Sequence, residues 1–478
     1  MKTKFSVGSI CAGTLALMCG GELRENIAPD RMVSSICTDS READADTVFV
    51  ALRGERVDGH DYIPVALAAG CRCIICEKGS KAMEDVGASV IMVSDSELAL
   101  AYLANTYRKA LHAKTVGVTG SVGKTTTKDM IHSVLSKRFH VYKTPGNHNS
   151  LVGMPLSVTE IPTDTEWAIL EMGMSGFGEV ERLSVAAQPD IAVITNIGTA
   201  HLEMMGTREN ICRAKLEILC GLKNGGVLIL NGDEPLLAGI GGKSYRTVYV
   251  SAAGKKADFS AQNIRVETDQ TLFDIVWAGG TERDLCLHVM GKHNVYAALY
   301  AFAIAVMSGM SIDKIRAGLA EFAPEGIRQN RSDCCGVTIF ADCYNASPES
   351  MIAAIDVLDA YCQKTGRRGI AVLGDMLELG TDSAALHRGV GNHLAASSVK
   401  WLFTIGSGGS QIALGARQKG MSTATIRQNR VLDRPNDTLE ELKKIVQPGD
   451  AILFKASRAV GEEVLIAGLE EYLQLGAK

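Results

Sequence analysis

One segment of the 478-residue chain has the residue types and spacing that bind a nucleotide triphosphate. A glycine turn leads directly into Lys124 and Thr125. In such a segment the backbone N–H groups and the N-terminus of the next helix bind phosphate oxygens, the lysine reaches the outer phosphates, and the threonine hydroxyl meets Mg²⁺. The residues predicted to bind the nucleotide here are Thr119, Gly120, Ser121, Val122, Gly123, Lys124, Thr125 and Thr126.

The elements on either side of this phosphate loop support the interpretation. Residues 115–118 form a short apolar run that predicts a strand. The residues after the loop predict a helix with one apolar face, formed by Met130, Ile131, Val134 and Leu135. The loop is not a strict Walker A sequence, because Val118 stands where that pattern has glycine. The segment has the narrower form TGxxGKTT.

Two residues after later predicted strands could bind magnesium. Glu171 ends the apolar run 167–171, and His201 follows the run 191–196 and a glycine turn. Because the carboxyl ends of parallel strands border one crevice, both side chains are expected beside the phosphate loop, where Mg²⁺ needs ligands. For Glu171 we favour the metal role over a solvated charge. For His201 the residues leave a structural role and a metal or phosphate role equally open.

Other polar residues are weaker candidates. Lys215 lies in a predicted helix, where a lysine is usually a solvated charge. Arg328 and Arg331 lie in a polar break, 323–333, from which an arginine could reach a phosphate. Three polar clusters follow predicted strands of the last third of the chain, Asp342-Cys-Tyr-Asn-Ala-Ser-Pro348, Gly374-Asp-Met-Leu-Glu-Leu-Gly380 and Lys455-Ala-Ser-Arg458. Such strand ends line ligand crevices in open α/β sheets.

The alternation of short apolar runs with helical patterns predicts an α/β protein of three domains. The predicted boundaries are 1–112, 113–323 and 324–478. The central domain is predicted to have a parallel sheet behind the phosphate loop, with a β-rich stretch, 259–288, added at its edge. The last domain repeats the doubly wound pattern without a phosphate loop.

Bulk composition excludes several classes of protein. A net charge of −5 leaves no basic footprint for nucleic acid, and no stretch is long and apolar enough to cross a membrane. The 13 cysteines lack the spacing of zinc ligands and suggest free thiols of a reducing cytoplasm. Residues 2–19 have a charged and then an apolar part, as signal peptides do, but we favour a first helix that ends at Gly20.

Taken together, the motifs resemble the Mur ligase superfamily, which forms amide bonds in peptidoglycan precursors. The segments that carry the resemblance occur in the family's order over nearly the whole chain: TGSVGKTT, Gly146-Asn-His-Asn149, Glu171-Met-Gly, Asn196-Ile-Gly-Thr-Ala-His201, Arg213-Ala-Lys215 and Gly291-Lys-His-Asn294. Thr38-Asp-Ser-Arg41 and residues 49–60 resemble the family's UDP-sugar-binding domain. The first and third units look most like the members that add D-alanyl-D-alanine.

The resemblance implies roles for individual residues. Magnesium, with two ions expected, would be held by Thr125, Glu171, His201 and Lys215. Lys215 matches a lysine that many members carry as a carbamate. Asn294 would contact the adenine, although Ala297 replaces a common family asparagine. Arg328 would approach the γ-phosphate, but the unusual Gln329-Asn-Arg331 leaves open which arginine serves. The expected substrate-binding residues are Ser40, Arg41, Asn147, Asn149, Asp342 and Asn345.

The implied activity is an ATP-dependent ligation of D-alanyl-D-alanine to UDP-N-acetylmuramoyl-tripeptide through an acyl phosphate, in a cytoplasmic monomer. The third residue of the tripeptide, lysine or diaminopimelate, stays open. A tripeptide-forming or folylpolyglutamate-type ligase of the same superfamily is the alternative. The folate enzymes would lack a UDP-sugar domain before the loop. A non-catalytic scaffold would lack Lys124, Glu171 or His201, and a GTPase switch would carry a guanine-reading motif that this chain does not have.

Overall fold

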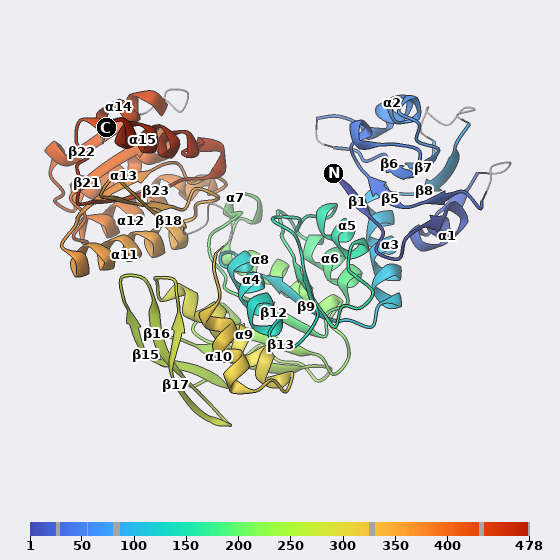
Figure 1. The fold of residues 1–478 in the computed structure, drawn as a ribbon, viewed down its shortest axis with the longest axis horizontal. Coiled ribbons are helices and arrows are strands. Elements are labelled where there is room, and N and C mark those ends of the chain that lie inside the picture. The colour runs from blue at the N-terminus through green and yellow to red at the C-terminus, as the bar shows by residue number, and fades with distance from the viewer. Residues whose placement is uncertain (25–28, 55, 80–86, 325–329, 430–434, 477–478) are drawn as a thin grey trace.

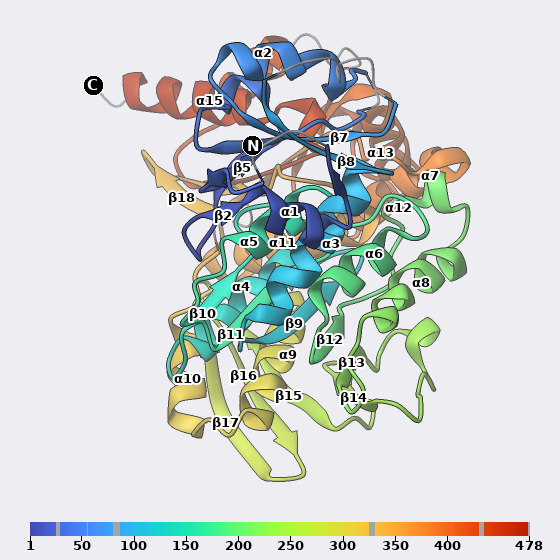
Figure 2. The same ribbon diagram turned by 90° about the vertical axis from the view of Figure 1, so that its right-hand side faces the viewer.

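The chain folds into three α/β units that follow one another along the sequence (Figure 1). The computed structural model describes residues 1–24, 29–54, 56–79, 87–324, 330–429 and 435–476. In Figure 1 the N-terminal unit and the C-terminal unit lie on opposite sides of the central unit. Figure 2 turns the molecule so that the N-terminal unit faces the viewer. The predicted three-domain α/β class is confirmed, whereas the boundaries 1–112, 113–323 and 324–478 stay a prediction.

The first unit has a six-stranded sheet in the order β1-β5-β6-β7-β8-β3. The inner strands are parallel, and both edge strands run antiparallel to their neighbours. Its strands are β1 (Lys2–Lys4), β3 (Glu22–Leu23), β5 (Ser35–Cys37), β6 (Thr47–Val50), β7 (Cys73–Glu77) and β8 (Ser89–Val93), with a ribbon of β2 (Ile10–Cys11) and β4 (Met32–Val33). Its helices are α1 (Ala12–Cys19), α2 (Ile63–Ala68) and α3 (Ser96–Ala110). The helix predicted before Gly20 is present, and Gly20 ends it with a left-handed φ of 65°.

The central unit has a nine-stranded sheet in the order β10-β11-β9-β12-β13-β14-β15-β16-β17. Strands β10 to β15 are parallel and β16 and β17 are antiparallel, so the predicted added edge is confirmed. Its strands are β9 (Lys114–Thr119), β10 (Val141–Lys143), β11 (Trp167–Glu171), β12 (Ile191–Ile194), β13 (Val227–Asn231), β14 (Arg246–Ser251), β15 (Phe259–Val266), β16 (Thr271–Trp277) and β17 (Gly280–Leu287). Its helices are α4 (Lys124–Leu135), α5 (Gly153–Thr159), α6 (Glu179–Ala187), α7 (Leu202–Met205), α8 (Arg208–Leu216), α9 (His293–Met307) and α10 (Ile312–Ala320).

Helices cover both faces of the central sheet. Successive side chains of its strands point to opposite faces and therefore belong to two separate apolar cores. Trp167 and Ile169 of β11 pack with α4, α9 and α10, whereas Ala168 and Leu170 pack with α3, α5 and α6. The four predicted apolar residues of α4 are all fully buried in the first of these cores.

The third unit has a six-stranded sheet in the order β18-β19-β23-β20-β21-β22. Only the pairing of β18 with β19 is antiparallel. Its strands are β18 (Asn330–Cys334), β19 (Val337–Ala341), β20 (Arg368–Leu373), β21 (Trp401–Ile405), β22 (Ile426–Asn429) and β23 (Asp450–Lys455), and its helices are α11 (Pro348–Thr365), α12 (Ser383–Ala395), α13 (Gly406–Gln418), α14 (Pro435–Lys443) and α15 (Glu463–Gly476). The polar break predicted at 323–333 was partly wrong, since its end forms the edge strand β18.

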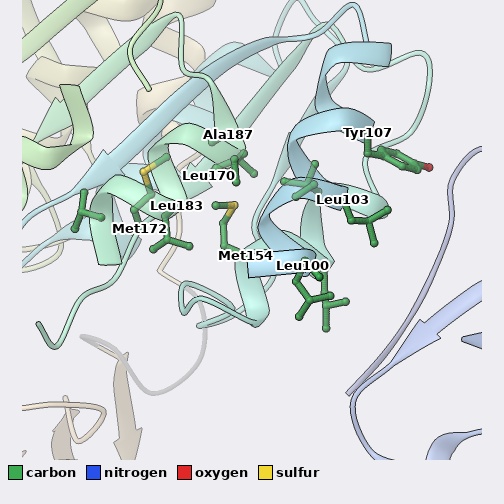
Figure 3. Packing of buried hydrophobic residues seen from close by; sticks show 14 of the residues in the cluster. Leu100, Leu103, Tyr107, Met154, Leu170, Met172, Leu183 and Ala187 are labelled. Atoms are coloured by element: carbon green, nitrogen blue, oxygen red, sulfur yellow. The ribbon is translucent and has the colours of Figure 1, made fainter. Parts of the chain in front are cut away.

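Helix α3 connects the first unit to the central one. It packs on α1 of the first unit and on α5 and α6 of the central unit. Figure 3 labels Leu100, Leu103 and Tyr107 of this helix beside side chains of α5, β11 and α6, all within one buried cluster. The two units therefore share one apolar core. Within the described residues, no helix is both long enough and apolar enough to cross a bilayer.

We predict that Leu103→Ala lowers the free energy of unfolding by about 2–5 kcal/mol, because it leaves a cavity in this shared core. Tyr102→Ala on the same helix is the control, since Tyr102 is 48% exposed and Leu103 only 1%. Urea denaturation measures both variants. Equal losses from the two would contradict the role of α3 as a buried connection.

Candidate active site

The candidate site lies at the carboxyl edge of the central sheet, where strand β9 runs between β11 and β12. In the parallel register Glu171 pairs with Val118, and Ile194 pairs with Thr119. The phosphate loop, Glu171 and the segment after β12 therefore leave the sheet at one level. Val118 is a fully buried strand residue, which explains why glycine is absent from that position.

Two glycines give the phosphate loop its path. Gly120 has a φ of +147°, and a Cβ atom there would lie 1.8 Å from Thr195 Oγ1. Gly123 has a φ of +80° and stands at the N-terminus of α4. Any larger residue at position 120 would collide with the segment after β12.

Hydrogen bonds join the loop to that neighbouring segment. The Val122 N–H donates to Asn196 Oδ1 at 2.9 Å, and the Gly198 N–H donates to Ser121 Oγ at 2.9 Å. Lys124 Nζ donates to the Gly120 carbonyl at 2.8 Å and to the Ser121 carbonyl at 3.3 Å. Lys124 therefore lies over the phosphate loop, whose bound phosphates it is predicted to contact.

Glu171 is buried and is not the solvated strand-end charge that was the alternative. Its Oε1 accepts a hydrogen bond from Asn149 Nδ2 at 2.7 Å. Its Oε2 is buried without a hydrogen-bond partner and lies 3.6 Å from Lys128 Nζ. A buried carboxylate oxygen with no donor is costly unless a cation satisfies it.

Lys128 was missed by the sequence analysis. Its side chain is 1% exposed, and Nζ donates to the carbonyls of Thr144 at 2.9 Å and Gly146 at 3.0 Å. The ammonium therefore fixes the loop that carries Asn149 and gives Glu171 a counter-charge. A signal was present, because Lys128 precedes Ile131 by three residues and so falls on the apolar face of α4.

Lys215 is fully buried, so it is not a solvated surface charge. Burial first, and then the positive charge of Lys124, lowers the pKa of the Lys215 amine well below its ordinary value. A neutral amine is the form that can react with carbon dioxide. The structure thus places the Lys215 amine away from water and shifts it towards the neutral form.

His201 contacts the third unit. Its Nδ1 lies 2.5 Å from Oε2 of Glu378, and this neighbour lowers the pKa of the Glu378 carboxyl. Glu349 of α11 contacts the same turn, where its Oε1 accepts from the Thr199 N–H at 2.9 Å. Glu378 belongs to the polar cluster 374–380 noted in the sequence, whereas Glu349 was missed. Nothing local indicates which distant turn either glutamate meets.

A cavity of about 1080 Å³ lies between the central and third units. The predicted residues that line it are Ser121, Val122, Gly123, Lys124, Thr125, Thr126, Asn149, Glu171, His201, Asn294, Asp342 and Asn345. Thr119, Gly120 and Lys215 lie behind this surface. Asn147 is exposed outside it, and Arg328 falls outside the described residues.

The two candidates of the first unit do not reach this cavity. Ser40 and Arg41 belong to a short 3-10 turn, Ser40–Glu42. Ser40 is buried, and the guanidinium of Arg41 is paired with Asp39 at 2.6 Å. The structure therefore leaves these two residues in a separate place from the phosphate loop.

Further polar groups line the cavity wall. Asp342 pairs with the buried Lys455 at 2.5 Å, and Lys455 Nζ also donates to the Asn345 carbonyl at 3.0 Å. On the central unit, Asp233 Oδ2 accepts from the Tyr296 hydroxyl at 2.8 Å. Lys455 belongs to a polar cluster noted in the sequence, whereas Asp233 and Tyr296 were missed.

The residues present fit a magnesium ion that is shared with a nucleotide. Among the described side chains, no three of the His, Cys, Asp and Glu types cluster so as to hold a metal by themselves. Magnesium bound to nucleotides needs only one or two carboxylates, because phosphates and waters supply the rest. Oε2 of Glu171, which has no hydrogen-bond partner and lines the cavity beside the phosphate loop, meets that requirement.

A phosphate loop at the carboxyl edge of a parallel sheet, facing a cavity closed by a second α/β unit, defines a nucleotide-binding enzyme. Three family models match the chain: the Mur ligase middle domain over residues 118–305, the Mur ligase glutamate ligase domain over 328–458, and the Mur ligase family catalytic domain over 32–108. The chain is 38% identical to the UDP-N-acetylmuramoyl-tripeptide–D-alanyl-D-alanine ligase of Bacillus subtilis (strain 168), covering 96% of this chain and 97% of the relative.

Solved structures agree with the family models. The crystal structure of MurF from Acinetobacter baumannii superposes with a TM-score of 0.88 at 30% identity, covering 97% of this chain and 99% of that one. MurF ligase from Thermotoga maritima in complex with ADP gives a TM-score of 0.80 at 29% identity, covering 92% and 98%. The chain belongs to the Mur ligase family.

We predict that Lys128→Met lowers the free energy of unfolding by about 3–5 kcal/mol, because it leaves Glu171 buried without its counter-charge. Lys143→Met is the matched control. Lys143 pairs with the neighbouring Asp129 at 2.9 Å but is 18% exposed, so a smaller loss is expected. Denaturant unfolding compares the two variants, and a loss at Lys128 no larger than that at Lys143 would refute the assignment.

Proposed function

We propose that this chain is an ATP-dependent ligase that joins D-alanyl-D-alanine to UDP-N-acetylmuramoyl-tripeptide, releasing ADP and phosphate, in peptidoglycan precursor synthesis. The observation that carries the proposal is the single cavity onto which the phosphate loop, Glu171 and the Asp342–Lys455 pair all open. The name of the Bacillus subtilis relative, matched over 97% of its length, supplies the substrates.

The reaction must activate a carboxylate, which is a poor acyl donor. A carboxylate oxygen of the tripeptide attacks the γ-phosphorus of ATP, ADP leaves, and an acyl phosphate results. The free amine of D-alanyl-D-alanine then adds to the acyl carbon, and the tetrahedral intermediate expels phosphate as the amide forms. Lys124 stabilises the negative charge that gathers on the transferred phosphoryl group.

The nucleotide phosphates are bound by Lys124 together with Thr119, Gly120, Ser121, Val122, Gly123, Thr125 and Thr126. Asn294 contacts the adenine. The γ-phosphate is contacted by Arg328 or by Arg331, and of these Arg331 lines the cavity. When bound, magnesium supplies positive charge against the phosphoryl oxygens. Thr125, Glu171, His201 and Lys215, the last as a carbamate, would hold two ions. The unpartnered Glu171 Oε2 and the buried Lys215 support this set.

The substrates are divided among the units. Ser40 and Arg41 bind the UDP-sugar end from the first unit, and Asn147 and Asn149 bind near the reacting carboxylate. Asp342 and Asn345 bind the dipeptide from the third unit, where Lys455 fixes both of them. The UDP-sugar end and the reacting carboxylate are separated by the sugar and the tripeptide, so the first-unit residues need not line the cavity. We expect the units to close over the substrates, which excludes water from the acyl phosphate.

We propose that the enzyme is a monomer. The use of ATP supports a cytoplasmic enzyme. No nucleic acid and no membrane insertion enter the proposal. The alternative ligases of the superfamily are not favoured, because the relatives matched along nearly their whole length carry the D-alanyl-D-alanine name.

We predict phosphate release only when ATP, UDP-N-acetylmuramoyl-tripeptide and D-alanyl-D-alanine are all present. Lys124→Ala is expected to abolish turnover while leaving the circular dichroism spectrum unchanged, because the Lys124 side chain lies partly exposed on the cavity wall and not in a core. Phosphate release without the dipeptide would contradict the proposal. Equal phosphate release when glutamate and a folate replace the two substrates would contradict it as well.

We also predict that the enzyme in ¹³C-labelled bicarbonate shows a carbamate carbonyl signal by NMR that Lys215→Met removes. The reason is the burial that lowers the pKa of the amine and keeps it nucleophilic. Lys223→Met, at a lysine that is 40% exposed and paired with Asp190, is the control and keeps the signal. A spectrum without a signal that depends on Lys215 would refute the carbamate.

A further inference from the structure

The ion pair between His201 and Glu378 joins two units at the candidate metal site. His201 follows β12 of the central unit, whereas Glu378 lies between β20 and α12 of the third unit. His201 Nδ1 and Glu378 Oε2 are 2.5 Å apart. The only carboxylate that contacts this imidazole within the described part of the chain thus comes from another unit.

The backbone on both sides of the pair is held in an unusual conformation. His201 and Glu378 both have left-handed φ angles, 64° and 63°. The Glu203 N–H donates to the Glu378 carbonyl at 3.0 Å. Gly380 is left-handed too, and a Cβ atom there would lie 3.1 Å from Glu203 Cα. Non-glycine residues keep such angles only where the surroundings fix them, often at functional sites.

The third unit also contacts the other end of the same turn. The Thr199 N–H and hydroxyl both donate to Glu349, at 2.9 and 3.1 Å. Gly198 lies so close that a Cβ atom there would be 2.9 Å from the Glu349 carboxyl carbon. The turn that carries His201 is therefore held at both ends by carboxylates of the third unit.

The contact defines which nitrogen of His201 is available. An imidazole whose Nδ1–H donates to a carboxylate presents the lone pair of Nε2 on its opposite side. Metal-binding histidines are commonly oriented in this way by a carboxylate behind the ring. His201 and Glu171 line the same cavity, which is where the proposed function expects the metal.

We propose that Glu378 is a positioning residue that orients the His201 imidazole from the third unit, so that metal binding at His201 depends on the docking of that unit. The inference rests on the proposed function, because it takes His201 as a metal ligand. Glu378 itself does not touch the metal. The metal site then depends on residues of two units, because His201 belongs to the central unit and Glu378 to the third. It is complete only when the third unit is docked.

Manganese affinity tests the proposal without turnover. Free Mn²⁺ is measured by electron paramagnetic resonance in the full-length enzyme with saturating ADP. Glu378→Ala should weaken Mn²⁺ binding by about 10- to 100-fold, the usual effect of losing such a partner. Glu378→Gln retains a carbonyl acceptor for Nδ1–H and should stay close to wild type. The Glu378 side chain is 56% exposed, so neither variant removes a core contact.

Lys364→Met is the matched control. Lys364 of α11 pairs with Glu267 of the central unit, so this variant removes an ion pair between the same two units without touching His201. It should keep the Mn²⁺ affinity of the wild type. An equal loss in Lys364→Met and Glu378→Ala would overturn the proposal, because the loss would then not depend on the contact between Glu378 and His201.

His201→Asn separates the proposal from the function on which it rests. If His201→Asn weakens Mn²⁺ binding and Glu378→Ala leaves it unchanged or tighter, the positioning role of Glu378 is wrong while the metal role of His201 stands. If His201→Asn has no effect, the metal role itself is wrong. Weaker binding in both, with Glu378→Gln near wild type, supports the proposal.

Discussion

The parallel order of three strands, with β9 between β11 and β12, is the constraint on which the site depends. Because the strands run the same way, the phosphate loop, Glu171 and the His201 turn all leave the sheet at one edge. Gly120 allows the loop to touch Thr195 after the neighbouring strand, and hydrogen bonds from Val122 and to Ser121 then join the segments. The residues proposed to bind the nucleotide and the metal are thus positioned by sheet register rather than by any one loop.

Buried charge is the second organising feature. Glu171, Lys128 and Lys215 are all nearly inaccessible to water, where an isolated charge is costly. Lys128 lies near Glu171 and binds two backbone carbonyls, whereas Lys215 lies near another cation. Burial and the nearby Lys124 lower the pKa of the Lys215 amine. The site therefore combines a buried carboxylate, Glu171, with a buried amine of lowered pKa, Lys215.

Local sequence predicted the elements well, because each has its own periodicity. The apolar face of α4 and the apolar runs of β9, β11 and β13 are visible without any partner. Residues fixed by distant contacts were not predictable in the same way. Strand β18 is polar because it is an edge strand, so its pattern resembles a loop. The contacts of Glu378, Glu349 and Lys128 depend on which surfaces the fold brings together. Lys128 had a local signal in its position on an apolar face, and Glu378 in its strand-end cluster, but Glu349 had none.

The central claim is that the loop presents a γ-phosphate to a peptide carboxylate and not to water. The most direct test uses UDP-N-acetylmuramoyl-tripeptide with ¹⁸O in its reacting carboxylate, together with ATP and D-alanyl-D-alanine. Mass spectrometry of the released phosphate then follows the label. The acyl-phosphate route predicts one ¹⁸O atom in each phosphate, because a carboxylate oxygen leaves with the phosphoryl group. Unlabelled phosphate formed along with the amide product would contradict the account.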